Sequence, residues 1–323
     1  MRERVVVTGL GVVSALGLGH KEYFKNLIGG QSGIKQITQF QPSEFGIQTQ
    51  VAGEIKNFDI LDYVSKNQAR RVDRMGAISL AAGLLAYEDS RLMMNRVTSD
   101  QMGVAVGAMI GPLGGVENNI LKKARGRKKL SARELMPMLP SQSASELGMT
   151  LGLKGPHLQI SGSGATSAQS MGLAFDMIQS GKVSVMFCGG AESTLHPAVV
   201  SLFESSGLLS KINDLSASRP FDKLRDGFVM GEGSGMLVLE SLSHARKRGA
   251  KIYAEIVGYG ESVESQERGL EIAVQKALTQ SKISKNKINY KKNNKSGMSE
   301  LPLVKIPEAQ EKYVSSNQII TIE

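Results

Sequence analysis

The chain has 323 residues, enough for about two domains, and its hydrophobic content is that of an ordinary folded protein. Its single cysteine excludes an intrachain disulfide and any multi-cysteine metal or iron–sulfur site, and four histidines leave little material for a histidine-rich metal centre. The net charge of +9 favours an acidic partner, whereas the absence of tryptophan argues against a platform that stacks nucleic-acid bases.

Neither a signal peptide nor a membrane segment is indicated. The first ten residues pass directly into a strand-like valine run, where a signal peptide would continue with a longer apolar region. The longest apolar runs, such as residues 78–86, are far shorter than the roughly 20 residues that cross a bilayer. The sequence therefore predicts a soluble cytoplasmic protein that binds neither membrane nor nucleic acid.

Short β-type runs alternate with helical stretches along most of the chain. Apolar runs predict strands at residues 5–7, 103–110, 158–161, 183–188, 235–240 and 252–257. Apolar periodicity predicts helices at residues 77–90, 166–180 and 270–278. Nearly continuous apolar strands separated by helices are typical of a mostly parallel sheet covered on both faces, so the predicted fold class is α/β.

Two glycines follow the first strand. Gly9 and Gly11 resemble the start of a dinucleotide-binding turn, but Ser14 occupies the third glycine position. No acidic residue closes a second strand where ribose binding would need one. We therefore interpret this segment as a tight turn between a strand and a helix.

A basic run occupies residues 122–129, which contain Lys and Arg but no acid. A solvated loop and a docking surface for an acidic partner are both consistent with it. If a partner binds, the attraction is expected to act through salt-sensitive steering.

Residues 160–166 join a predicted strand to a predicted helix and carry the hydroxyl groups of Ser161, Ser163 and Thr166. Nucleophiles often occupy such a junction because helix N–H groups point at the reacting centre. Ser163 is an alternative nucleophile that would need a base. The sequence does not place any of the four histidines beside it: His20, His157, His196 and His244.

Cys188 lies inside the apolar run VSVMFCGGAE. A lone cysteine on an apolar strand is usually a small buried hydrophobic residue and not a nucleophile. We interpret Cys188 as structural.

Residues 282–295 are rich in lysine and asparagine and contain no acid, and the segment that follows has two prolines and no clear periodicity. This composition resists formation of a core. We expect residues 290–323 to be a loosely ordered extension.

Several segments together resemble the β-ketoacyl-acyl carrier protein synthases, above all the type II elongating enzymes. They are RVVVTGLGVVSALG at the start, GLKGPHLQIS before the junction, CGGAES after it, and the RPFD–RDGFV–GEG–G series within residues 218–260. The resemblance covers about residues 3–289 and implies a thiolase-like fold of two related α/β halves. It divides the chain into a complete N-terminal half at residues 1–250, the start of a truncated C-terminal half at 251–289, and the extension.

The resemblance also implies a catalytic cysteine at the start of the helix, acylated by a chain that acyl carrier protein delivers. In an ungapped comparison this position is Gly164, which has no side chain to form a thioester. The family's two catalytic histidines, its lysine and its gating Gly-Phe loop have no match in this chain. No catalytic residue is therefore intact, no cofactor or metal is expected, and condensation by this chain alone is not predicted.

Other features of the family are present. Ile110, in GAMIGPLGG, corresponds to the acyl-pocket segment that reaches the dimer interface, where a bulky side chain limits the depth of the acyl tunnel. The positions that meet the acidic carrier protein correspond to Arg70, Arg71, Lys128, Lys129 and Lys211. The basic run and the resemblance thus indicate the same partner, acyl carrier protein.

Three functional hypotheses follow. The first is a non-condensing subunit that pairs with an active ketosynthase in fatty acid or polyketide-type elongation, as chain-length factors do, with a homodimer as the alternative assembly. Chain-length factors usually carry glutamine at the cysteine position and a full-length second half, and this chain has neither. The second is residual 3-oxoacyl-acyl carrier protein synthase or malonyl-carrier decarboxylase activity, and the third is a carrier-binding module without chemistry.

A short second half also predicts that the strand at 252–257 and the helix at 270–278 lack packing partners. Their exposed apolar face would mark either an interface that a partner subunit covers or a liability of a degraded or truncated, barely stable gene product.

Overall fold

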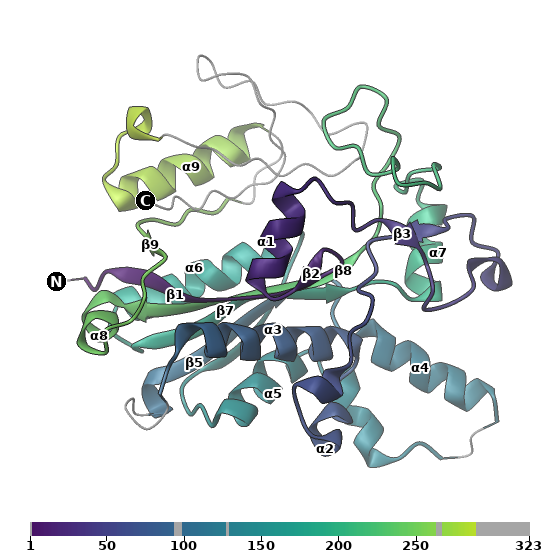
Figure 1. The fold of residues 1–323 in the computed structure, drawn as a ribbon, viewed down its shortest axis with the longest axis horizontal. Helices are drawn as coiled ribbons and strands as arrows, with labels where there is room; N and C mark the ends of the chain where they lie inside the picture. The colour runs from purple at the N-terminus through teal and green to yellow at the C-terminus, as the bar shows by residue number, and fades with distance from the viewer. Residues whose placement is uncertain (1, 94–98, 127–128, 263–266, 289–323) are drawn as a thin grey trace.

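In a computed structural model the chain forms one large sheet between two layers of helices (Figure 1). The structure describes residues 2–93, 99–126, 129–262 and 267–288. The strands of the large sheet are β1 (Val5–Ser14), β2 (Gly17–Leu18), β5 (Met102–Ala108), β6 (His157–Ser161), β7 (Val185–Ser193), β8 (Glu232–Ser241) and β9 (Ala254–Ile256). They lie in the order β2-β1-β8-β7-β5-β6, and β9 pairs with the start of β1, on the same edge that β2 occupies at its end.

Helices cover both faces of this sheet. They are α1 (His20–Ile28), α2 (Lys66–Ala69), α3 (Arg74–Ser90), α4 (Leu113–Ala124), α5 (Gln142–Leu151), α6 (Thr166–Gln179), α7 (Pro197–Ser205), α8 (Leu242–Lys247) and α9 (Glu267–Ser281). Figure 1 shows α3 and α5 below the sheet, and α6, α1 and α9 above it. A small pair, β3 (Lys35–Gln36) and β4 (Val51–Ala52), lies in the excursion between α1 and α2. The α/β fold class is confirmed.

The sheet is mixed, so the prediction of a mostly parallel sheet is wrong. β5 runs parallel to β6 and β7, but β8 runs antiparallel to both β7 and β1. A continuous apolar run indicates that a strand is buried on both faces. This burial does not determine whether the neighbouring strands run parallel or antiparallel to it.

The predicted turn at residues 8–11 is also wrong, because β1 continues through both glycines to Ser14. A β-carbon on Gly9 would lie 2.4 Å from the carbonyl oxygen of Ala86, and one on Gly11 would lie 1.9 Å from that of Ala82. The glycines therefore allow α3 to approach the strand closely. They form no phosphate-binding turn.

The segment after β8 buries its own apolar face, against our expectation. β9 adds to the free edge of β1, and Leu270, Ala273 and Ala277 of α9 are buried. A β-carbon on Gly260 would lie 2.0 Å from the carbonyl oxygen of Ala273, so the backbone after β9 packs directly on the helix. Among the apolar residues that we expected to be exposed in this segment, Ile252 is exposed, with 40% of its surface accessible to solvent.

One buried carboxylate joins four parts of the fold. Glu232, at the start of β8, accepts hydrogen bonds from the Nε of Arg74 at 2.7 Å and from the Oγ of Ser193 at 2.9 Å. It also accepts from the backbone N–H of Ile55 at 3.0 Å and the amide of Gln39 at 2.9 Å. The excursion, α3, β7 and β8 are thus fastened at one point.

Two further predictions concern the C-terminal extension and the absence of a membrane-spanning helix. The expected extension, residues 290–323, lies outside the described residues, so its order stays a prediction. Among the helices that the structure describes, none has both the length and the apolar character to cross a bilayer.

Asp73 caps the N-terminus of α3, where its side chain accepts from the backbone N–H of Gly76 at 2.9 Å. Burial raises the pKa of Asp73 to about 6, although hydrogen bonds from Gly76 and Gly115 act in the opposite direction. A raised folded-state pKa means that the folded protein holds this proton more tightly than the unfolded chain. The contribution to stability is complete below about pH 4 and is lost as the pH rises through about 6.

We therefore expect Asp73→Asn, which keeps a capping side chain but cannot ionise, to unfold at a higher urea concentration than the wild type at pH 7.5. The gain should be up to about 3 kcal/mol at pH 7.5 and smaller at pH 5. Asp59→Asn is the matched control, because Asp59 caps an exposed turn through the N–H of Leu61. An equal gain for Asp73→Asn at both pH values would contradict this assignment.

Candidate functional site

The junction between β6 and α6 lies at the carboxyl end of a strand that runs parallel to β5. Its turn is closed locally, because the hydroxyl and the backbone N–H of Thr166 both donate to the carbonyl oxygen of Ser163, at 2.9 and 3.2 Å. Ser163 and Gly164 are exposed. The first turn of α6 presents its unpaired N–H groups here, which favours a developing negative charge.

Gly164 is not required by the backbone. Its φ is not in the left-handed region, and a β-carbon built on it would meet no heavy atom within 4 Å. Most glycines near the sheet differ: on Gly107, for example, a β-carbon would lie 2.3 Å from the carbonyl oxygen of Thr166. The position aligned with the family's nucleophile is therefore open and able to accept a side chain.

Cys188 is fully buried on β7, as predicted. It packs with Ala105, Phe175 and Leu239 in the apolar cluster on the α6 side of the sheet. Burial raises the pKa of Cys188 far above the ordinary range, so the thiol stays protonated and unreactive.

The structure places the four histidines at separate points, and none of their hydrogen bonds in the described residues reaches Ser163. His20 lies 3.8 Å from a carboxylate oxygen of Asp89, and His244 pairs with Glu240. The ring of His157 packs on Gly148. No group of three or more His, Cys, Asp or Glu side chains among the described residues is arranged to hold a metal ion.

The ring of His196 is more enclosed than the rings of His20 and His244. It precedes α7 and packs on Gly114 of α4, and its Nε2 is buried without a hydrogen-bond partner in the described part of the chain. Burial lowers the pKa of His196, although the Glu117 carboxylate, 3.9 Å from Nδ1, raises it in part. The ring is therefore held mainly in its neutral form.

Glu192, at the end of β7, fixes the loop that carries Ile110. Its carboxylate accepts hydrogen bonds from the backbone N–H groups of Met109 at 2.8 Å, Ile110 at 3.0 Å and Gly111 at 3.1 Å. The Ile110 side chain is half-buried and packs against the cluster that contains Leu195. The segment predicted to limit the acyl tunnel thus has a defined position, and that role of Ile110 stays a prediction.

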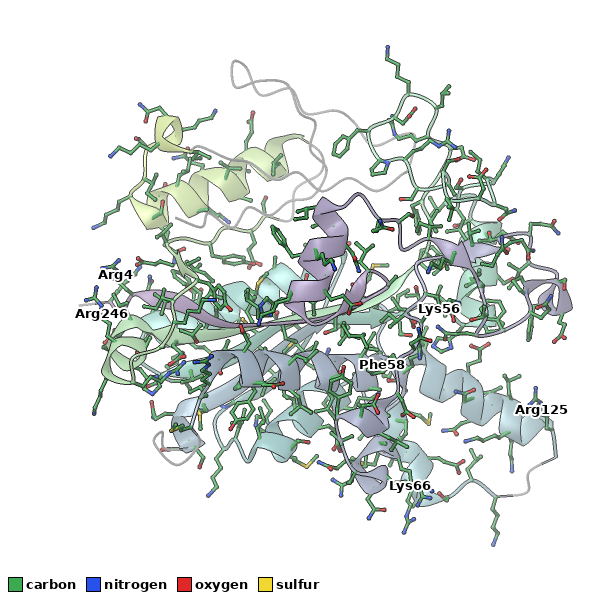
Figure 2. The ribbon with its side chains drawn as sticks, viewed as in Figure 1. Arg4, Lys56, Phe58, Lys66, Arg125 and Arg246 are labelled. Atoms are coloured by element: carbon green, nitrogen blue, oxygen red, sulfur yellow. The ribbon has the colours of Figure 1, made fainter. Side chains whose placement is uncertain are left out.

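The predicted carrier-facing residues belong to three separate segments. Arg70 and Arg71 link α2 to α3, Lys129 follows α4, and Lys211 follows α7; all four are exposed. Lys128 lies outside the described residues. Figure 2 shows Lys66 of α2 and Arg125 after α4 both toward the lower right of the view.

Arg71 has a structural contact that the sequence did not indicate. Its Nη1 lies 3.8 Å from Glu146 of α5, whose side chain is almost fully buried and whose two oxygens have no hydrogen bond in the described part of the chain. Burial raises the pKa of Glu146, and Arg71 lowers it in part. Arg71 therefore compensates a buried carboxylate as well as presenting charge to solvent.

Sequence reasoning missed the roles of Glu192 and Glu232. Both lie in quoted segments, CGGAES and GEG, but their hydrogen-bond partners are far away along the chain. An acidic residue within a buried strand run is the signal that points to such a role, because a carboxylate is almost never buried without partners.

Comparisons with known proteins agree with this geometry. The profile of the family described as "Beta-ketoacyl synthase, N-terminal domain" matches residues 2–245. The chain is 40% identical over 264 residues to a 3-oxoacyl-[acyl-carrier-protein] synthase 2 of Synechocystis sp., covering 80% of this chain and 62% of that protein. It is 41% identical over 266 residues to the protein of the same name from Vibrio cholerae, covering 81% and 63%. The chain thus spans less than two thirds of these curated relatives.

Solved structures show the same architecture. A type II PKS acyl-carrier protein in complex with its ketosynthase matches with a TM-score of 0.79 and 28% identity, over 90% of this chain and 72% of that one. The ishigamide ketosynthase/chain length factor matches with a TM-score of 0.79 and 29% identity, over the same shares. A beta-ketoacyl synthase from Burkholderia phymatum matches with a TM-score of 0.77 and 30% identity, over 89% and 72%. The thiolase-like ketosynthase fold is confirmed.

Gly164→Cys tests whether the junction can hold an active thiol. We expect this variant to fold with unchanged stability and to gain one thiol that reacts with iodoacetamide in the native state, because the position is open and exposed. The wild type should show no reactive thiol, because Cys188 is buried. Native labelling followed by intact-protein mass spectrometry gives the stoichiometry.

Ser205→Cys, at the exposed C-terminal end of α7, is the matched control. A helix N-terminus lowers a thiol pKa and a helix C-terminus does not, so the thiol at position 164 should be deprotonated at a lower pH than the thiol at position 205. Equal pH profiles, or labelling of native wild-type protein, would contradict our description of the site.

Proposed function

The chain belongs to the β-ketoacyl synthase family, and we propose that it is a non-condensing subunit of fatty acid or polyketide-type chain elongation that pairs with an active β-ketoacyl-acyl carrier protein synthase. The observation that most directly supports this proposal is the absence of a side chain at Gly164, a position with open space around it. Without a thiol there, no acyl-enzyme forms at the junction. Cys188 does not replace it, because that thiol is buried and protonated.

A residual condensing or decarboxylating activity is less well supported. It would need a base beside Ser163, and the described histidines make their contacts elsewhere, with Asp89, Gly148, Gly114 and Glu240. The relatives named as 3-oxoacyl-[acyl-carrier-protein] synthases extend well beyond the part that this chain matches. Their activity therefore does not transfer to this chain through similarity alone.

The outer edge of β6 supports the pairing. β6 pairs only with β5 among the described strands, so its other edge has backbone donors and acceptors available for a further strand. We place the contact with the synthase subunit, or with a second copy of this chain, at this edge.

The exposed cations beside α2 and after α4 support docking of an acyl carrier protein. One of the similar solved structures is that of a type II PKS acyl-carrier protein in complex with its ketosynthase. For this chain we propose Arg70, Arg71, Lys129 and Lys211 as contacts, and Ile110 as the residue that limits an acyl tunnel shared with the partner. We also retain residues 1–250 and 251–289 as the two parts of the domain organisation.

Pairing is tested by co-expressing this chain with a cysteine-bearing β-ketoacyl synthase from the same genome, each with its own tag. We expect a 1:1 complex by light scattering after tandem purification. After incubation with an acylated carrier protein, intact mass should show the acyl group on the synthase alone, because this chain has no nucleophile at position 164. A chain that stays monomeric beside the synthase, or that itself becomes acylated, would overturn the proposal.

Carrier docking is tested by titrating the chain with an acyl carrier protein at two salt concentrations. We expect affinity to fall as salt rises, and Lys129→Glu to weaken binding by about fivefold at low salt, because an exposed charge contributes up to about 1 kcal/mol. Lys247→Glu, on exposed α8, is the matched control and should have a smaller effect. Equal effects of the two variants would mean that the protein attracts the carrier only through its net charge.

A further inference from the structure

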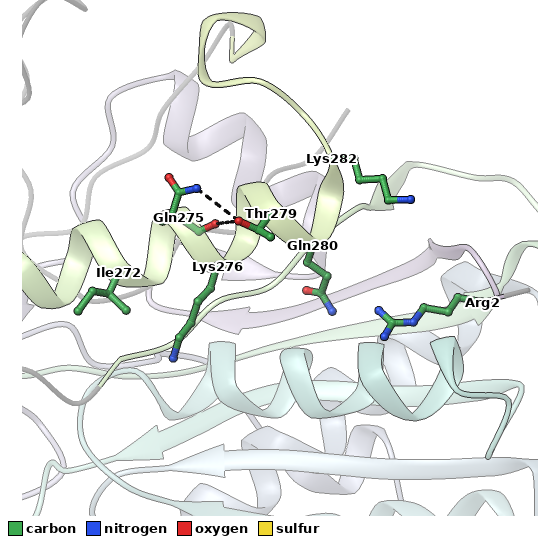
Figure 3. A pocket seen from close by; sticks show the side chains of 7 residues that line it. All are labelled: Arg2, Ile272, Gln275, Lys276, Thr279, Gln280 and Lys282. Carbon is green, nitrogen blue, oxygen red and sulfur yellow. Dashed lines mark hydrogen bonds between the residues drawn. The ribbon is translucent and has the colours of Figure 1, made fainter.

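A cavity of about 570 Å³ lies between α9 and the N-terminal segment of the chain (Figure 3). It is open to solvent, because most of its lining side chains are exposed. Figure 3 shows Arg2, Lys276 and Gln280 extending into the space below α9, with Lys282 at the end of that helix. This cavity has no part in the proposed function.

The lining is basic and contains no acid. Arg2, Lys276 and Lys282 supply three cations, and none of them forms an ion pair within the described part of the chain. The ammonium of Lys276 donates to the backbone carbonyl of Glu261 at 2.8 Å, and one guanidinium nitrogen of Arg2 donates to Gln179 at 3.3 Å. Both groups keep further N–H donors for a ligand, since an ammonium has three and a guanidinium five.

Neutral groups complete the lining. The amide of Gln280 is anchored, because its oxygen accepts from the N–H of Tyr259 at 2.7 Å. Thr279 and Gln275 bond to each other across one turn of α9. Ile272 contributes an apolar, half-buried side chain at one end. A ligand that suits this lining has an anionic group and a small apolar body.

Helix ends offset part of the positive charge. α6 ends at Gln179, next to Arg2, and α9 ends at Ser281, next to Lys282. Each C-terminal end carries about −0.5 of a charge, so two ends remove about one of the three positive charges. The carboxylate of Asp176, 3.4 Å from the amide nitrogen of Gln280, removes about one more, so the cavity keeps a net charge of about +1, which favours an anionic ligand.

From this geometry we propose that the cavity binds a small organic phosphate, with its phosphate group on Lys276 and its apolar part on Ile272, one turn earlier on α9, while Arg2 and Lys282 add to the positive field. The site is distinct from the Gly164 junction. α6 has 14 residues and separates the two, which places them about 20 Å apart along the helix axis. Failure of this proposal leaves the proposed function untouched, and the reverse also holds.

Calorimetric titration of the full chain with phenyl phosphate tests the site, with inorganic phosphate and phenol as the two part-ligands. We expect saturable binding of phenyl phosphate with a dissociation constant on the order of 1 mM or below, tighter than that of either part. The double variant Lys276→Gln/Lys282→Gln should weaken it at least about fivefold, because each exposed cation contributes up to about 1 kcal/mol. Ile272→Ala should weaken phenyl phosphate but not inorganic phosphate.

Lys247→Gln on α8 is the matched control and should leave binding unchanged. Thermal unfolding of each variant checks that it is folded. The proposal is overturned if phenyl phosphate does not saturate the protein by about 10 mM, a concentration that any site in this affinity range would fill. It is also overturned if inorganic phosphate binds as tightly, or if the double variant and Lys247→Gln have equal effects.

Discussion

The buried ion pair between Arg74 and Glu232 is the constraint on which this end of the molecule depends. Glu232 is fully buried, and taking a carboxylate out of water is costly unless every oxygen has partners. Here the guanidinium, the hydroxyl of Ser193, the N–H of Ile55 and the amide of Gln39 together supply them. Because removing one partner of a buried pair costs about 3–5 kcal/mol, this contact strongly stabilises the packing of the excursion, α3, β7 and β8 on one another.

Glu192 fixes a second loop in the same way. Three backbone N–H groups on its carboxylate hold the loop after β5, and with it Ile110. The scaffold of a ketosynthase site is therefore present in contacts that are spread over the chain, whereas the nucleophile depends on a single side chain at position 164. Under our proposal, the absence of that side chain removes the chemistry while the architecture is kept, which is the combination that a non-condensing subunit requires.

Much of this fold follows from local patterns, and the failures have one cause. The apolar runs predicted the existence of α3, α6, β5, β7 and β8, because periodicity and burial are local properties. Strand direction, the close packing of Gly9 and Gly11 on α3, and the burial of α9 depend on which elements meet in space. At the site, the sequence predicted the buried Cys188 and the lack of a side chain at Gly164. It did not predict the partners of Glu192 and Glu232, because a hydrogen bond between distant segments leaves no periodic signal in the sequence.

α6 connects the two sites and sets opposite electrostatic demands at its ends. Its N-terminal end, beside Gly164, offers unpaired N–H groups and favours an anion or a thiolate. Its C-terminal end offers carbonyl oxygens and favours cations, and Arg2 lies there. The cations around the cavity therefore already interact with the carbonyl oxygens at the helix ends. A bound phosphate must compete with these oxygens for the same cations. This competition limits the affinity for phosphate. The three cations also offset the partial negative charges of the two helix ends, so the C-terminal ends of α6 and α9 can lie close together.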